Sequence, residues 1–96
     1  MRRIRWSPAA ANDLEHIRNY LRDNHPTLSQ STIRNLYAAA RSLKTSSYRG
    51  RPGKKENTRE LVVAPMPYII VYAVEAEIVQ IFRVIHTSQD WQGAIS

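Results

Sequence analysis

The residues with the clearest chemical potential in this 96-residue chain are the cations near its midpoint. Gly50, Pro52 and Gly53 predict a loop there, and the surrounding stretch from 41 to 59 contains a single acid, Glu56. A loop that offers backbone N–H groups and positive charge together suits phosphates or carboxylates. A solvated loop without a ligand is an equally good interpretation. The stretch holds seven of the fourteen lysines and arginines: Arg41, Lys44, Arg49, Arg51, Lys54, Lys55 and Arg59.

Two arginines occupy unusual positions within apolar segments. In a strand, every second residue faces the same side. By this alternation Arg59 and Arg83 each fall on the same side as neighbouring leucine, isoleucine and valine residues. A cation at an apolar position is exposed at an edge, paired with an acid, or directed at an anion in a groove. Glu60 and Glu75 are possible structural partners. We expect Arg83 to face a functional groove, and for Arg59 the groove and the structural pair are equally favoured.

Other catalytic and metal-binding patterns are missing from the sequence. Gly53-Lys54-Lys55 lacks the preceding glycine and the following Ser/Thr of a phosphate-binding P-loop. His16, His25 and His86 lack the spacing of metal ligands, and the chain has no cysteine. We therefore expect no metal and no cofactor, and we expect His16 and His25 to be structural.

The elements that position these residues follow from hydrophobic periodicity. Residues 2–6 alternate basic and apolar side chains, which predicts a short strand. Ser7-Pro8 then begins a helix, because serine caps free N–H groups and proline suits the first helical position. Its apolar residues recur at helical spacing until His25-Pro26, where the helix must end. A second amphipathic helix should begin with Thr27 or Ser29 as its cap and end near Ser46-Ser47.

The rest of the chain predicts strands. We expect them at 58–64, 68–75 and 77–85, with a tight reversal around Ala76 and a loop over 48–57. The middle strand is apolar on both faces, which is typical of a central strand. The order β-α-α-β-β-β predicts an α+β fold in which a helical hairpin packs on a mainly antiparallel, curved sheet. At this length the chain should form a single domain over 1–96.

Composition limits the kind of partner and the compartment. The net charge of +6 and pI near 10.2 favour an acidic protein segment, a nucleic acid or an anionic surface. No apolar run follows the basic N-terminus, and the longest uncharged stretch, 61–74, is too short to span a bilayer. We therefore expect a soluble, cytoplasmic protein without a membrane partner.

Three stretches together resemble the RelE/ParE superfamily of toxins. The opening segment is Trp6-Ser7-Pro8 with Asp13-Leu14, Ile17 and Tyr20. The sheet core is Gly50-Arg51-Pro52-Gly53, Thr58-Arg59-Glu60-Leu61-Val62-Val63 and Pro67-Tyr68-Ile69-Ile70-Val71-Tyr72. The end is Arg83-Val84-Ile85-His86 followed by Asp90-Trp91. Their order and spacing, over about ninety residues, carry the resemblance.

The resemblance implies a toxin that arrests growth until a co-expressed, partly acidic antitoxin binds it. The excess positive charge and the apolar helix faces fit such a partner. As antitoxin-binding candidates we take Leu21, Tyr37 and Arg41. As candidates for binding a target or a phosphate we take Arg51, Lys54, Lys55, Arg59, Arg83, His86 and Trp91.

The superfamily has two branches, and the sequence is closer to one of them. RelE-like members cleave mRNA on the ribosome and carry an arginine directly after the first tyrosine of the strand at 68–72, where this chain has Ile69. ParE-like members resemble it in the Arg83-Val84-Ile85-His86 ending and in the proline before Tyr68. The resemblance to ParE implies poisoning of DNA gyrase by binding, without catalysis.

Two alternatives stay open. In a RelE-like nuclease, His86 would act as general acid and Arg59 and Arg83 would hold the scissile phosphate, with Lys54 or Lys55 in support. A third interpretation is a nucleic-acid-binding module that needs no antitoxin.

Overall fold

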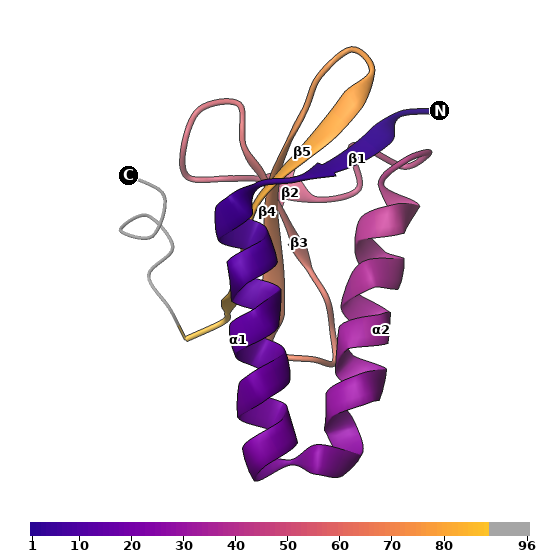
Figure 1. Cartoon of the computed structure of the whole chain (residues 1–96). Helices are drawn as coiled ribbons and strands as arrows, with labels where there is room; N and C mark the ends of the chain where they lie inside the picture. Colours follow the sequence, from indigo (N-terminus) through magenta and orange to yellow (C-terminus); the bar gives the residue numbers. More distant parts are fainter. Residues whose placement is uncertain (89–96) are drawn as a thin grey trace.

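Two helices pack against a five-stranded sheet in the computed structural model (Figure 1), which describes residues 1–88. The helices are α1 (Pro8–Asn24) and α2 (Pro26–Ser42). The strands are β1 (Arg3–Trp6), β2 (Arg51–Pro52), β3 (Arg59–Val62), β4 (Tyr68–Val74) and β5 (Ile78–His86). The α+β class and the predicted order are confirmed, except that the two-residue β2 lies inside the predicted loop 48–57.

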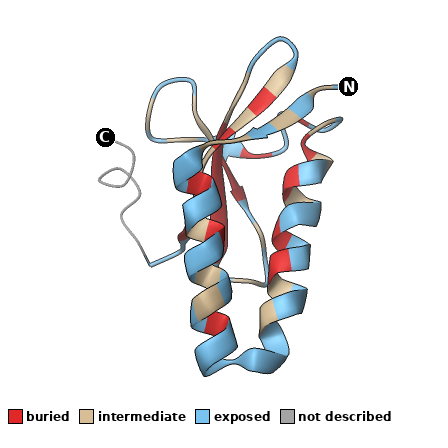
Figure 2. Ribbon diagram, viewed as in Figure 1, coloured by how far each residue is buried: buried red, intermediate tan, exposed pale blue. Residues whose placement is uncertain are grey.

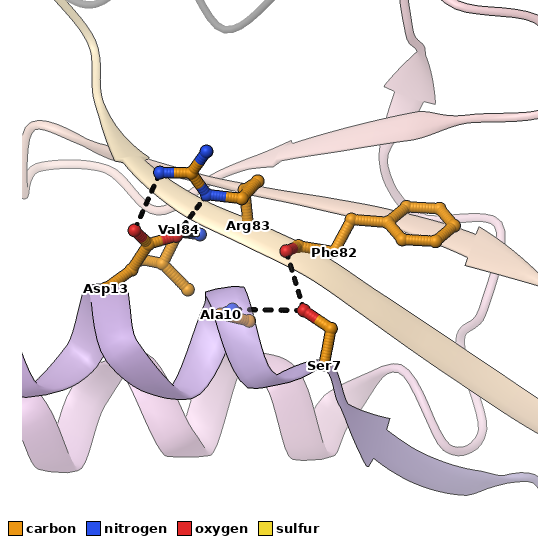
Figure 3. Close-up of polar contacts among 6 residues, drawn as sticks. All are labelled: Ser7, Ala10, Asp13, Phe82, Arg83 and Val84. Atoms are coloured by element: carbon orange, nitrogen blue, oxygen red, sulfur yellow. Dashed lines mark hydrogen bonds and ion pairs between the residues drawn. The ribbon is translucent and has the colours of Figure 1, made fainter. Parts of the chain in front are cut away.

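The start of α1 is fixed by Ser7, as the sequence predicts. The Ser7 hydroxyl accepts a hydrogen bond from the Ala10 N–H at 3.0 Å and donates one to the Phe82 carbonyl at 2.8 Å. The Ser7 N–H also donates to the Ile81 carbonyl. One residue therefore caps α1 and joins it to β5 (Figure 3).

The start and the end of α2 differ from the prediction. The helix begins at Pro26, and His25 ends α1 and caps α2 without a side-chain hydrogen bond, so a cap at Thr27 or Ser29 is wrong. Proline is accepted there because the first helical N–H has no partner within the helix. The helix also ends at Ser42, before Ser46-Ser47. The antiparallel helical hairpin itself is confirmed (Figure 1).

The sheet order is β1-β5-β4-β3-β2, so β4 is central, as its apolar pattern predicts. β1 pairs with β5 in parallel and the other neighbours are antiparallel. The β4–β5 pairing is irregular: Ile81 lies opposite Tyr72, but Arg83 lies opposite Val71. β5 thus has one extra residue at Phe82, a β-bulge that ends the regular alternation. Because of this extra residue, Arg83 does not face the same side of the sheet as Val79 and Ile81, although the alternation in sequence predicts that it does.

Most of the buried side chains lie between the helices and the sheet (Figure 2). Leu36 and Leu43 belong to the same cluster as Ile70 and Tyr72 of the sheet, and these four side chains are fully buried. A smaller cluster, Ile69, Val71 and Ile85, is formed by residues of β4 and β5. None of the helices in residues 1–88 is long and apolar enough to cross a membrane.

Tyr72 combines core packing with two hydrogen bonds to the chain after α2. Its hydroxyl donates to the Ser47 carbonyl at 2.8 Å and accepts from the Gly50 N–H at 2.9 Å. Gly50 must lack a side chain, since a Cβ there would lie 2.7 Å from this hydroxyl and 2.8 Å from the Glu60 carbonyl oxygen. The Tyr72 hydroxyl therefore fixes the path of residues 47–50.

Tyr72→Phe should lower the free energy of unfolding by about 1–3 kcal/mol, because it leaves two buried backbone groups without their partner. Urea unfolding measures the loss. Tyr37→Phe is the matched control, since it removes a hydroxyl from a tyrosine that is 40% exposed. Equal stability of the two variants would contradict the anchoring role.

Candidate functional site

An ion pair joins the middle of α1 to the far half of β5. Arg83 Nε lies 2.7 Å from Asp13 Oδ2, and Arg83 Nη2 lies 2.8 Å from Asp13 Oδ1 (Figure 3). The Val84 N–H donates to the same Oδ2 at 2.9 Å. The side chains are only 20% and 11% exposed. Hydrogen bonding to Asp13 raises the pKa of Arg83 above its ordinary value, against the opposing effect of burial.

The partner of Arg83 is thus Asp13, which the sequence analysis did not identify. Its position carried a usable signal: Asp13 lies three residues after Ala10 and four before Ile17, beside the buried stripe of α1. An acid at the border of a buried stripe is expected to have a partner when the helix packs. The predicted acid Glu60 is paired with Arg51 instead.

A pocket of about 270 Å³ lies beside this ion pair, between α1 and the end of β5. Exposed His16 and His86 line it from opposite elements, together with Tyr20 and Tyr68. The rings of Tyr68 and His86 pack edge to face with centroids 5.7 Å apart. Burial, and to a smaller extent Tyr20, raises the pKa of the Tyr68 phenol. The placement of His16 in a pocket with His86 was not predicted, because nothing in their separation along the chain indicates it.

Arg59 lies in a different place from Arg83 and His86. It lines a pocket of about 520 Å³ with Tyr48 and residues of β4 and its following turn. Its guanidinium donates to the carbonyls of Gly50 at 3.1 Å and Tyr48 at 3.4 Å. The structure therefore does not bring Arg59, Arg83 and His86 into one pocket.

The other candidate cations of the loop 48–57, Arg51, Lys54 and Lys55, differ in their contacts and exposure. Arg51 donates through Nε and Nη2 to Glu60 Oε1 at 3.0 and 2.9 Å, and Glu60 is only 4% exposed. Lys54 is exposed and Lys55 half-buried in the turn before β3. That turn is closed by hydrogen bonds from the Gly53 N–H to the Thr58 carbonyl and from the Thr58 hydroxyl to the Lys55 carbonyl.

The predicted antitoxin-binding residues differ in accessibility. Leu21 is 6% exposed, so it offers little surface to a partner. Tyr37 is 40% exposed and packs edge to face on Trp6 at 5.3 Å, and Arg41, one turn later on α2, is exposed. Trp91 lies outside the described residues. Within residues 1–88 no group of three or more acidic or histidine side chains could hold a metal ion.

Comparisons with known proteins agree with this architecture. The family described as "ParE toxin of type II toxin-antitoxin system, parDE" matches residues 4–91. The chain is 36% identical to "Putative toxin Y4kP" of Sinorhizobium fredii, over 94% of this chain and 93% of that protein. It is 37% identical to "Toxin RelE2" of Caulobacter vibrioides, over 93% and 99%. A structure titled "Chromosomal ParDE TA system from P. aeruginosa" superimposes with a TM-score of 0.82 at 21% identity, covering 90% of this chain and 96% of that one.

Asp13→Asn should destabilise the protein by about 3 kcal/mol, because it leaves the guanidinium of Arg83 in a largely buried position without a counter-charge. Thermal and urea unfolding provide the measurement. Glu15→Gln, on the same helix, removes the exposed ion pair with Arg18 and should cost about 0.5 kcal/mol or less. A similar small loss for both variants would show that the Asp13–Arg83 pair does not hold α1 to β5.

Proposed function

Because this chain belongs to the ParE toxin family of type II toxin–antitoxin systems, we propose that it inhibits growth by binding DNA gyrase and is neutralised by an antitoxin. The choice of gyrase over mRNA as the target rests on the ion pairing of Arg83. This arginine is bound at two points by Asp13, in a largely buried ion pair. A cation whose charge is already balanced contributes little to binding the phosphate of a cleavage transition state.

The sheet offers a second argument for binding without cleavage. Ile69 stands where a RelE-like nuclease would have its arginine, and it is 8% exposed and paired with Val62 and Ile85. Arg59, the other candidate for a phosphate clamp, lies in a different pocket from Arg83 and is bound to backbone carbonyls. These features support a toxin that acts through its surface.

Neutralisation by an acidic antitoxin is supported by charge and by exposed side chains. The chain carries a net charge of +6, which favours encounter with an acidic partner. Tyr37 and Arg41 lie one turn apart on α2 and are both exposed, so one partner helix can contact the two together. Leu21 is buried, so it packs within the toxin and offers little surface to the antitoxin.

The alternative is a RelE-like, ribosome-dependent mRNA endoribonuclease. The observation in its favour is that His16 and His86 line the same pocket as Arg83, so a general acid and a general base could act on one phosphodiester. The relative named Toxin RelE2 is the other reason to test it.

Controlled expression in a bacterial host distinguishes the two targets when RNA primer extension and plasmid topology are measured in the same cells. We expect growth arrest with intact mRNA and a gyrase-dependent change in topology or DNA breaks. mRNA cuts at codon boundaries with normal topology would refute the gyrase proposal and establish the nuclease. If mRNA is the target, His86→Ala should abolish the cuts, because it removes the candidate general acid.

Arg41→Glu should separate toxicity from neutralisation. We expect this variant to arrest growth like the wild type but to escape rescue by its antitoxin, because a negative charge on α2 repels an acidic partner. Arg22→Glu, an equal charge change near the end of α1, is the control and should remain neutralised. Rescue of both variants alike would exclude Arg41 from the antitoxin interface.

A further inference from the structure

Two arginines from distant parts of the chain converge on one exposed tyrosine. The guanidinium carbon of Arg59 lies 5.2 Å from the centroid of the Tyr48 ring, and that of Arg2 lies 5.5 Å from the same centroid. The Tyr48 side chain is 62% exposed. The sequence analysis did not single out Arg2 or Tyr48, since 46 positions of chain separate them.

Backbone and side-chain hydrogen bonds hold this cluster of Arg2, Tyr48 and Arg59 in place. Arg2 donates to the Glu75 carbonyl at 2.8 Å and to the Ser47 hydroxyl at 3.1 Å. Arg59 donates to the carbonyls on both sides of Arg49, those of Tyr48 and Gly50. The buried Tyr72 hydroxyl fixes the chain on either side of Tyr48. The cluster is therefore organised before any ligand arrives.

Among residues 1–88, no acid forms an ion pair with either of these two arginines. Within residues 1–88, Arg51 and Arg83 form ion pairs with Glu60 and Asp13, whereas neither Arg2 nor Arg59 forms one. Both guanidinium groups lie within 5.5 Å of the same ring centroid, so an anion that contacts either group is also attracted by the charge of the other. Each group has N–H donors left for such an anion, because a guanidinium has five.

The chemistry around the cluster favours a nucleic acid over an acidic peptide. An exposed aromatic ring beside two cations offers a base a surface for packing while the phosphates contact the guanidinium groups. The adjoining pocket of about 520 Å³ is lined by apolar Ala73 and Val74 and by polar Asn57, Thr58 and Glu75. The Glu75 carboxylate repels phosphate but can accept hydrogen bonds from the amino groups of bases.

We propose that Arg2, Tyr48 and Arg59 form a binding site for single-stranded nucleic acid, with phosphate on the two guanidinium groups and a base against the tyrosine ring. The site lies apart from the pocket that contains Arg83, His16 and His86. It is also independent of whether the toxin acts on gyrase or on mRNA.

Fluorescence anisotropy with the full chain tests the site. The probe is a labelled DNA single strand of about 12 nucleotides, within the usual site sizes, and DNA lacks the 2′-OH that a ribonuclease would use. We expect Arg2→Gln and Tyr48→Leu each to weaken binding about fivefold or more. Arg2→Gln should also make the negative slope of log K against log salt shallower by about 0.7, the value for one lost phosphate contact on a single strand.

Matched controls keep the result interpretable. Arg34→Gln removes the same charge from an exposed position on α2 and should change affinity less than Arg2→Gln, and Tyr48→Phe keeps the ring and should bind like the wild type. Unchanged melting temperatures establish that the variants are folded. Equal effects of Arg2→Gln and Arg34→Gln, or no effect of Tyr48→Leu, would overturn the proposal. Displacement of the probe by an acidic peptide with equal potency, or equal affinity for duplex DNA, would also overturn it.

Discussion

The structure depends on how α1 is bonded to β5 at a single irregularity in the sheet. The bulge at Phe82 disrupts the regular ladder between β4 and β5. Polar side chains of α1 and its cap bond to the backbone at the bulge and just after it: the Ser7 hydroxyl donates to the Phe82 carbonyl, and the Asp13 carboxylate accepts from the Val84 N–H. Buried backbone groups must be paired, so these bonds specify where α1 lies along β5.

The same contact determines what the nearby pocket can do. Asp13 satisfies Val84 and at the same time binds both donor nitrogens that Arg83 presents to it. The carboxylate that stabilises the bulge therefore also takes up the positive charge at the end of β5. A phosphate would have to compete with a two-point ion pair from which water is largely excluded. Asp13 and a phosphate would compete for the same guanidinium of Arg83, and in this structure Asp13 holds it.

Local patterns predicted the elements well, because their causes are local. The cap at Ser7, the break at His25-Pro26 and the central position of the middle strand follow from adjacent residues and from periodicity. The two-residue β2 and the bulge at Phe82 were missed because each depends on a neighbouring strand that is distant in sequence. A bulge also invalidates parity arguments for the residues after it, so parity could not indicate that Arg83 pairs with Asp13.

The candidate site was less predictable than the fold for a related reason. Sequence analysis singled out the cations as candidate site residues, but a cation becomes available or unavailable only through its tertiary partner. Seventy positions separate Asp13 from Arg83, and 46 separate Arg2 from Tyr48. The number of cations in and around the loop 48–57 suggested an anion-binding site there. In the structure, however, Arg51 of this loop is paired with the buried Glu60.

The distribution of acids therefore explains the surface better than the net charge does. Asp13 and Glu60, both largely buried, each neutralise one arginine and stabilise the fold there. Arg2 and Arg59 are held instead by carbonyl and hydroxyl oxygens, which orient a guanidinium without cancelling its charge. Orientation by neutral acceptors is the arrangement that leaves a cation both fixed and able to attract an anion. The two guanidinium charges beside Tyr48 remain without an acidic partner in residues 1–88 for this reason, while the charge of Arg83 is balanced by Asp13.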